Sequence, residues 1–416
     1  MWYTCDRTLK SEEWSEYIQE EVELQKNFRA VLASEKKRLG FDGQQQTPFV
    51  AVVCEKERRL MMMIDHSTRS VEIPKYIIVR PDAIERFTQF FTNMDFSRAC
   101  VITQQPILSI VPEIASTIPP DSDRHVFLFA SERPELNQLI SMVKEVHTIK
   151  PEVLIGVGGG SVLDSVKFIS HIVNIPMVLI PTLASNDGIC SPVVSIKLEK
   201  GRSDSLRARM PFALFADTQL LSKAPQKYLF SGLGDVISNI TAIMDWELSS
   251  QKTGEKIDYF ARILSEMSYK SILNFSEPSM QNLNFIETLT DSLITSGISM
   301  EYAGSSRSAS GSEHMLSHAA DIVFKSAHLH GHQVGFYTCV ILKAYQTPLY
   351  QRVMDFFHTV GFFHHIPNAL LLSDPFRAIT GMARVIRKRY GIMSQLSDPE
   401  LKDVFESTVS DIRQRM

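Results

Sequence analysis

Short apolar runs alternate with longer polar stretches over the middle of the chain. Five such runs follow one another: KYIIV (75–79), ACVIT (99–103), HVFLFA (125–130), VLIGVG (153–158) and MVLIP (177–181). Short buried strands separated by helix-length segments are typical of βαβ units, in which helices cover both faces of a mostly parallel sheet. We expect this α/β region to extend to the run FALFAD at 212–217.

The pattern changes after this run to nearly continuous helical sequence. The segments 234–251, 259–275 and 285–304 predict helices, and the same character continues to the end of the chain. The sequence therefore predicts a nucleotide-type α/β domain at 71–221 and an all-α domain at 222–416. We expect the chemistry in the cleft between these two domains.

The first 70 residues have a different organisation and predict a small appended module. Residues 11–38 read as an amphipathic helix with Trp14, Ile18 and Val22 on one face. The apolar runs at 49–54 and 59–64 flank the charged tetrapeptide EKER, as in a hairpin. Such a module could be a subunit interface or could simply pack on its own domain.

Composition excludes several classes of protein. The net charge of −4 argues against a nucleic-acid partner, which would favour a basic face. The five cysteines are scattered and form no CxxC pair, which favours a reducing cytoplasm over a disulfide framework. The start of the chain does not resemble a signal peptide, and no apolar stretch is long enough for a membrane span. We therefore expect a cytoplasmic protein.

A glycine-rich turn joins the fourth predicted strand to a helix. Gly158, Gly159 and Gly160 would let the backbone approach a phosphate, and the start of the following helix would offer it free N–H groups. Ser161 stands where a dinucleotide fingerprint would have its third glycine. The turn predicts pyrophosphate binding, although a tight strand-to-helix turn without a ligand would also explain it.

Polar residues follow the next strand, in the segment 182–191. Thr182, Ser185, Asp187 and Ser191 supply hydroxyl groups and one carboxylate there. Ligands bind at the carboxyl ends of parallel strands, so this cluster is a second candidate for a binding site. An aspartate before a glycine is also ordinary turn chemistry, and this alternative stays open for Asp187.

The segment 311–335 holds five of the chain's twelve histidines, at positions 314, 318, 328, 330 and 332. His314 and His318 would share one face of a helix, as histidine pairs that bind divalent metals do. His330 follows in a turn, and the carboxylate of Asp235 is the best candidate for a further ligand. Two histidines and one carboxylate would leave open positions for catalysis. Surface or core histidines without a metal remain the alternative.

These segments together resemble the glycerol-1-phosphate dehydrogenases. That family belongs to the iron-containing alcohol dehydrogenase and glycerol dehydrogenase group, which shares its fold with dehydroquinate synthase. The resemblance covers about residues 71–393 and is carried by GVGGGSVLDSVK (156–167), IPTLASNDGICSPVVSI (180–196), the segments 215–249 and 296–321, HGHQVG (330–335) and RVIRKRYGIM (384–393). It implies a Rossmann-like parallel-sheet domain followed by an all-α domain.

The resemblance also implies roles for individual residues. Asp235, His314 and His330 look like ligands of one divalent metal, usually zinc, with nickel or iron as alternatives. His318 and Asp187 look like residues that contact the substrate and take part in catalysis. The expected NAD or NADP site consists of Gly158, Gly159, Gly160, Ser161, Asp164, Thr182, Ser185 and Ser191.

The implied reaction interconverts dihydroxyacetone phosphate and sn-glycerol 1-phosphate by hydride transfer with NAD or NADP. A substrate phosphate needs a cation, and Arg307 is a candidate by its position in the sequence. The resemblance also implies a homodimer or a larger homo-oligomer.

The sequence departs from the family's usual pattern at several points. Ser308 stands in place of a proline, and His332 in place of a glutamate beside the metal ligands, so a related phosphorylated ketone or polyol is also a possible substrate. The loop VITQQPILS (101–109) leaves the choice between NAD and NADP open. A cyclase like dehydroquinate synthase is the alternative enzyme, and a non-catalytic relative is a third possibility. Such a cyclase would carry a Gly-Gly-Lys run and a glutamate ligand, where this chain has NDGICSP (186–192) and GLGD (232–235).

Overall fold

The computed structural model describes residues 71–94, 96–119, 125–131, 134–197, 203–324 and 328–416. The predicted helix at 11–38 and the predicted hairpin at 49–64 lie outside these residues. The contacts of the remaining chain make residues Ser70–Met416 one compact unit. The predicted boundary between residues 221 and 222 falls inside helix α8 (Thr218–Lys223), and the division into two domains stays a prediction.

The predicted parallel sheet is confirmed, and it has six strands. Their order in the sheet is β1-β8-β5-β4-β2-β3, and every neighbouring pair is parallel. The strands are β1 (Tyr76–Arg80), β2 (Ala99–Thr103), β3 (His125–Phe129), β4 (Val153–Gly158), β5 (Met177–Pro181) and β8 (Ala213–Asp217). Every residue of β2, β4, β5 and β8 is buried, which explains why these strands read as unbroken apolar runs.

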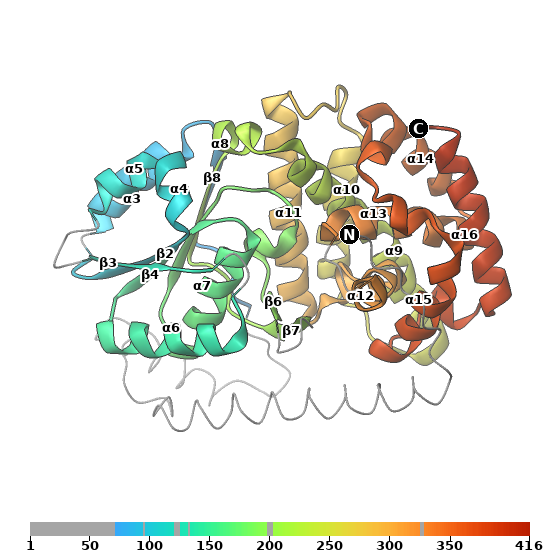
Figure 1. Cartoon of the computed structure of the whole chain (residues 1–416), viewed down its shortest axis with the longest axis horizontal. Helices are drawn as coiled ribbons and strands as arrows, with labels where there is room; N and C mark the ends of the chain where they lie inside the picture. Colours follow the sequence, from blue (N-terminus) through green and yellow to red (C-terminus); the bar gives the residue numbers. More distant parts are fainter. Residues whose placement is uncertain (1–70, 95, 120–124, 132–133, 198–202, 325–327) are drawn as a thin grey trace, which may run out of the picture. The chain divides into compact units, whose positions relative to one another are not determined.

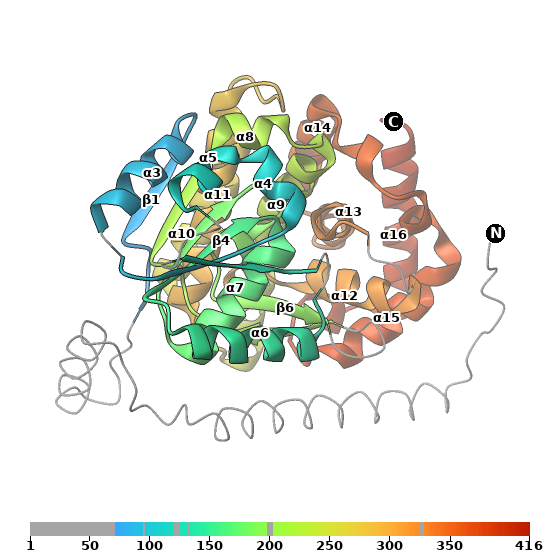
Figure 2. The ribbon, with the colours of Figure 1, turned by 60° about the vertical axis from the view of Figure 1, so that its left-hand side comes forward.

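Helices cover both faces of this sheet (Figures 1 and 2). On one face, Phe87 and Phe91 of α3 (Ala83–Met94) pack into a core with Ile114 of α5 and the inward side chains of the strands. The opposite face carries α6 and α7 (Figure 1). The remaining helices of this region are α4 (Gln105–Ile110), α5 (Pro112–Thr117), α6 (Leu136–Ile149) and α7 (Gly160–Val173). The arrangement is the doubly covered α/β layer that the sequence predicted.

The strand order places a ligand site at a definite edge of the sheet. The chain goes from β2 to the edge strand β3 and then crosses back to β4, on the other side of β2. The connections after β2 and β4 therefore leave the sheet in opposite directions. Such a switch point opens a crevice at the carboxyl ends of the two strands. The glycine turn after β4 lies at this crevice.

An antiparallel hairpin follows the second polar cluster, and the sequence analysis did not predict it. Strands β6 (Val193–Lys197) and β7 (Ser203–Arg207) pair with each other outside the main sheet. A short 3₁₀ helix, η1 (Asp187–Cys190), comes just before them. The polar cluster is thus followed by a 3₁₀ helix and a hairpin that extend the region between β5 and β8.

The predicted helical region is also confirmed. Its long helices are α9 (Gln226–Thr253), α10 (Tyr259–Leu273), α11 (Leu283–Ala303), α12 (Ser312–Phe324), α13 (His330–Ala344), α14 (Leu349–Val360), α15 (Ser373–Ile386) and α16 (Asp398–Arg413). Short 3₁₀ segments separate some of them, at η3 (Ser306–Ser308), η4 (Phe362–His365), η5 (Asn368–Leu371) and η6 (Ile392–Ser394). Among the described residues, none of the helices combines the length and the hydropathy that a membrane span requires.

Glycines allow α9 and α13 to approach each other closely. A Cβ atom on Gly331 would overlap the backbone carbonyl of Ser231, and one on Gly234 would overlap the carbonyl oxygen of Gly331. A Cβ on Gly335 would lie 2.9 Å from the Cα of Gly234. No other residue could occupy these positions without moving the two backbones apart. The contact brings Asp235 of α9 beside His330 of α13.

The substitution Gly331→Ala tests this contact. The added methyl group must push α13 away from α9, which we expect to cost about 1–3 kcal/mol of stability, as overpacked cores do. Gly381→Ala is the matched control, because Gly381 is an exposed glycine of α15 and an added Cβ would meet no atom within 4 Å. That variant should gain up to about 1 kcal/mol from helix propensity. Chemical denaturation measures both changes, and equal effects would contradict the role of the glycine contact.

Candidate metal and nucleotide site

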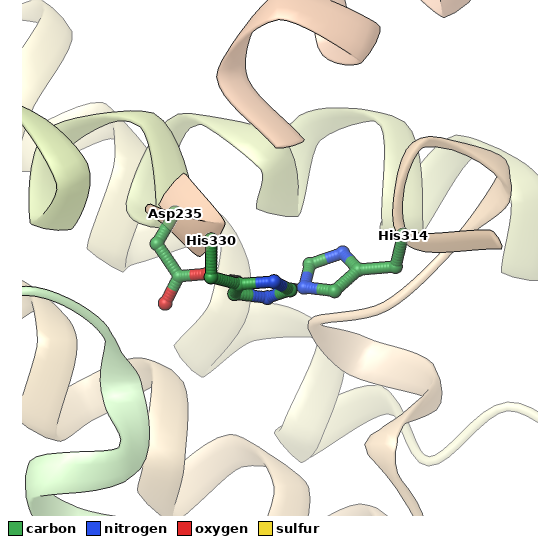
Figure 3. A group of neighbouring side chains, drawn as sticks. All are labelled: Asp235, His314 and His330. Atoms are coloured by element: carbon green, nitrogen blue, oxygen red, sulfur yellow. Dashed lines mark ion pairs between the residues drawn. The ribbon is translucent and has the colours of Figure 1, made fainter. Parts of the chain in front are cut away.

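Three side chains from three helices converge in the helical region. They are Asp235 of α9, His314 of α12 and His330 of α13 (Figure 3). Asp235 Oδ1 lies 3.8 Å from His314 Nε2 and 3.6 Å from His330 Nε2. Ligands of a tetrahedral zinc ion, each about 2.0–2.1 Å from the metal, are separated by roughly 3.4 Å. The group therefore has nearly the spacing that one divalent ion needs.

Burial sets the charge of these three groups. It lowers the pKa of His314 to about 3 and the pKa of His330 to about 3, so both imidazoles are neutral near pH 7. A neutral imidazole is the form that binds a metal. Burial, followed by the nearby charge of Asp187, raises the pKa of Asp235 well above its usual value. A divalent cation would reverse that effect and stabilise the carboxylate, so the donor set fits a metal.

His318 lies beside this group without belonging to it. Its ring centroid is 6.4 Å from that of His314 and 5.8 Å from that of His330. Burial, and then the charge of Arg387, hold its pKa well below the ordinary value, so His318 is also neutral near pH 7. The structure thus brings His318 next to the candidate metal site, where the resemblance expects a substrate contact.

Asp187 is connected to the site through its backbone. Its N–H donates a hydrogen bond of 2.8 Å to Asp235 Oδ2, and its own Oδ2 accepts one of 3.1 Å from Ser296. Burial raises the pKa of Asp187 to about 6. The sequence pointed only to the side chain of Asp187, whereas its backbone N–H holds the carboxylate of a candidate metal ligand.

A cavity of about 1420 Å³ opens at the switch point of the sheet. Six of the predicted cofactor residues line it: Gly159, Gly160, Ser161, Asp164, Thr182 and Ser185. Ser161 Oγ is buried and has no hydrogen-bond partner within the described part of the chain. The first N–H groups of α7 also lack partners within their helix. The cavity therefore places the start of a helix where the glycine turn predicted a phosphate site, and phosphate binding there stays a prediction.

The other two predicted cofactor residues do not line this cavity. Gly158 is the last residue of β4, and its carbonyl accepts a hydrogen bond from Thr182 N at 2.9 Å. Ser191 is buried, and its hydroxyl donates to the carbonyl of Val193 at 3.2 Å. Both residues shape the backbone around the cavity.

A fully buried lysine, missed in the sequence analysis, lies behind the cavity wall. Lys167 Nζ donates to the carbonyls of Gly188 and Val193, both at 2.7 Å, and forms an ion pair of 2.9 Å with Asp164. The other carboxylate oxygen of Asp164 accepts a hydrogen bond from Ser195 N at 3.0 Å. Asp164 and Lys167 thus attach α7 to η1 and β6. The sequence signal for this contact was a single lysine within the mostly apolar segment that forms α7.

Three arginines lie near α12: Arg307, Arg387 and Arg389. The structure does not support the expectation that Arg307 binds the substrate phosphate. Arg307 is buried and forms three hydrogen bonds to the carboxylate of Glu255, the shortest being 2.7 Å, so its charge already has a partner. Arg387 donates to Ser310 Oγ at 2.9 Å, and Arg389 to the carbonyl of Ser310 at 3.1 Å. These two guanidinium groups lie at the start of α12, and their charges help to lower the pKa of His314 and His318.

Sequence comparison identifies the family. The family model described as iron-containing alcohol dehydrogenase matches residues 78–225. The glycerol-1-phosphate dehydrogenase [NAD(P)+] of Nitrosopumilus maritimus is 30% identical over 346 residues, which cover 82% of this chain and 97% of that protein. The enzyme of the same name from Thermococcus sibiricus is 34% identical over 299 residues, covering 70% of this chain and 83% of that protein. This chain belongs to the glycerol-1-phosphate dehydrogenase family.

Solved structures of the wider group share the fold. The glycerol dehydrogenase of Schizosaccharomyces pombe superposes with a TM-score of 0.69 at 19% identity, over 84% of this chain and 92% of that one. An iron-containing alcohol dehydrogenase of Thermotoga maritima gives 0.60 at 12% identity, over 82% of this chain and 100% of that one. The resemblance seen in the sequence is confirmed for both the family and the fold.

His332, the unusual histidine of the HGHQVG segment, is not in the ligand group. Its Nε2 lies 2.8 Å from the backbone carbonyl of Lys227, to which it can donate a hydrogen bond, and its ring centroid is 5.7 Å from that of His365. Burial lowers the pKa of His332 to about 4. The structure therefore places this departure from the family pattern against the start of α9 and gives no support to a changed substrate contact.

Two histidine substitutions should separate the ligand group from its neighbours. His314→Ala removes one donor of the set, so we expect the bound divalent metal to fall from about one ion per chain to near zero. His332→Gln keeps a side-chain donor for the Lys227 carbonyl and should retain the metal. Elemental analysis after dialysis measures both variants. Full metal content in His314→Ala would show that the ligand assignment is wrong.

Proposed function

We propose that this chain catalyses the reversible, NAD(P)-linked reduction of dihydroxyacetone phosphate to sn-glycerol 1-phosphate. The observation that carries the proposal is the convergence of Asp235, His314 and His330 beside His318. Relatives that match most of their length to this chain are named for that activity. The cavity at the glycine turn supports the assignment of a dinucleotide as the second component.

The proposed ligands would hold one divalent metal, for which we infer zinc. Bound there, such an ion would supply a Lewis acid for the ketone oxygen, and the nicotinamide would supply or accept the hydride. The protein's own groups orient the reactants. Neutral His318 offers one N–H donor and one acceptor nitrogen, so it can hold a substrate hydroxyl group or carry its proton. The half-buried carboxylate of Asp187 is a second candidate for substrate contact.

Arg387 and Arg389 are our candidates for the substrate phosphate. Both are attached to Ser310, four residues before His314, so they lie at the start of the helix that carries the ligand and His318. Guanidinium groups match phosphate geometry and stay charged at neutral pH. A phosphorylated ketone bound through its oxygen at the metal could thus meet positive charge at its other end.

The cyclase remains the alternative within the same fold. It is less well supported, because the candidate ligands are Asp235, His314 and His330, and the glutamate ligand expected of such a cyclase is not among them. A cyclase would also return its nucleotide unchanged after each turnover, whereas a dehydrogenase consumes it.

Cellular location and assembly belong to this proposal as well. Cys100, Cys190 and Cys339 are buried free thiols, which agrees with a reducing cytoplasm. We also infer a homodimer or larger homo-oligomer, with the first 70 residues as one candidate interface.

An assay with NADH and NADPH tests the proposed reaction. Purified protein should oxidise one or both nucleotides when dihydroxyacetone phosphate is added, and sn-glycerol 1-phosphate should accumulate in equal amount. A chelator should abolish the rate, and added zinc should restore it. Absence of nucleotide oxidation by metal-loaded protein with this and related phosphorylated ketones would contradict the proposal.

The substitution Arg387→Gln tests phosphate recognition. Loss of a charged hydrogen bond costs about 1.5–3 kcal/mol, which corresponds to a rise in KM for dihydroxyacetone phosphate of roughly 10- to 150-fold. The rate with unphosphorylated dihydroxyacetone should change little, because that substrate has no phosphate to bind. Arg377→Gln is the control, since Arg377 is an exposed arginine of the neighbouring helix α15. Equal losses with both substrates would assign Arg387 a structural role.

A further inference from the structure

A buried carboxylate contacts one of the candidate metal ligands. Glu313 is 0% exposed, and its Oε1 lies 2.9 Å from Nδ1 of His314. The same oxygen accepts a hydrogen bond of 2.6 Å from Gly311 N, and Oε2 accepts one of 2.6 Å from Thr241. Glu313 therefore connects α9, through Thr241, to the imidazole of His314.

The two ring nitrogens of His314 face different partners. Nδ1 points at the carboxylate, whereas Nε2 is the atom that faces Asp235. A carboxylate accepts hydrogen bonds, so its presence keeps the proton of neutral His314 on Nδ1 and leaves the lone pair of Nε2 for a metal. We propose that Glu313 is a positioning residue, which fixes the tautomer and orientation of His314 and thereby raises the affinity of the site for its divalent metal.

Among the described residues, the second histidine has no carboxylate in the equivalent position. Nδ1 of His330 lies 3.5 Å from the hydroxyl of Ser317, which is at the limit of a hydrogen bond, and Ser317 also donates to Gln333 at 3.3 Å. With its proton directed at Gln333, this hydroxyl can only accept from His330, over 3.5 Å and without a charge, so it selects one tautomer more weakly than a carboxylate does. The chain thus holds His314 firmly and His330 loosely, and Glu313 should contribute more to metal affinity than Ser317.

The residues around Glu313 are shaped to accommodate its buried carboxylate. A Cβ atom on Gly311 would lie 2.8 Å from Glu313 Oε2 and 2.9 Å from Asp245 Oδ2, so the glycine leaves room for both carboxylates. Asp245 has separate partners, among them Ser312 N at 2.6 Å and Tyr345 OH at 2.6 Å. A buried carboxylate costs stability, and its hydrogen bonds offset that cost only in part. A gain in metal affinity would explain why this costly carboxylate lies next to a candidate ligand.

The inference rests on the metal site of the proposed function, but it can be tested without any substrate. The experiment measures the zinc dissociation constant of the full chain by competition with a chromophoric chelator. Glu313→Gln keeps the size of the side chain and removes its charge, and Glu313→Ala removes the contact. We expect both variants to bind zinc about 10–100-fold more weakly than the wild type, as is usual when the partner of a ligating histidine is lost. Ser317→Ala should weaken binding less than either.

Asp245→Asn is the matched control for a change within the same buried region. Asp245 contacts no candidate ligand directly, so this variant should lower the unfolding temperature but keep its zinc dissociation constant within about threefold of the wild type. Glu313→Gln should instead weaken zinc binding by the same factor of about 10–100, whatever its effect on the unfolding temperature of the metal-free protein. Equal loss of zinc affinity in Asp245→Asn and Glu313→Gln would overturn the inference, since it would reflect loosening of the start of α12.

Zinc affinity unchanged in both Glu313 variants would also overturn the positioning role. If neither variant folds, ¹⁵N spectra of the wild-type imidazoles decide. A proton on Nδ1 of metal-free His314 supports the inference, and one on Nε2 overturns it. The outcomes for the two proposals are distinct: zinc binding that depends on Glu313, without turnover of any phosphorylated ketone, would overturn only the proposed reaction. Wild-type protein that binds no divalent metal would overturn both.

Discussion

The close contact between α9 and α13 is the constraint on which the candidate metal site depends. Asp235 follows Gly234, and His330 precedes Gly331, so each candidate ligand is adjacent to a glycine of the contact. Two helices that pack through larger side chains lie 8–10 Å apart. At that separation, the side chains of Asp235 and His330 would lie farther apart than the ligands of one metal ion do. The glycines thus set the distance between two ligands, and α12 supplies the third.

Electrostatics adds a second constraint, because several acidic groups are buried around one point. Burial raises the pKa of Asp235, and the nearby charges of Asp187 and Glu313 raise it further. Backbone and hydroxyl donors satisfy part of this negative charge. Arg387 and Arg389 contribute positive charge, but they hydrogen-bond Ser310 at the start of α12 and not the three carboxylates. A divalent cation among the ligands would offset the remainder, so a metal stabilises both the site and the packing around it.

The sequence predicted the sheet well and the site only in part. Strands such as β4 and β5 are buried on both faces, so their apolar runs are unambiguous, whereas the mixed pattern of β6 and β7 resembles a loop. Helical spacing alone would pair His314 with His318. The choice of His330 came from family resemblance, because it depends on how α12 and α13 pack. The pairing of Arg307 with Glu255 joins residues 52 positions apart, which no local pattern reveals.

Hydrogen bonds through η1 connect the candidate nucleotide cavity to the candidate metal site. Lys167 of α7 binds the carbonyl of Gly188, and the preceding residue, Asp187, donates its N–H to Asp235. The helix that begins at the glycine turn is thus connected to a candidate metal ligand through one lysine and one short 3₁₀ helix. Hydride transfer requires the nicotinamide and the carbonyl carbon to be held at a fixed distance. The fully buried Lys167 is a rigid way to maintain that distance, since moving α7 relative to η1 would break its hydrogen bonds to the carbonyls of Gly188 and Val193 and leave only the ion pair with Asp164.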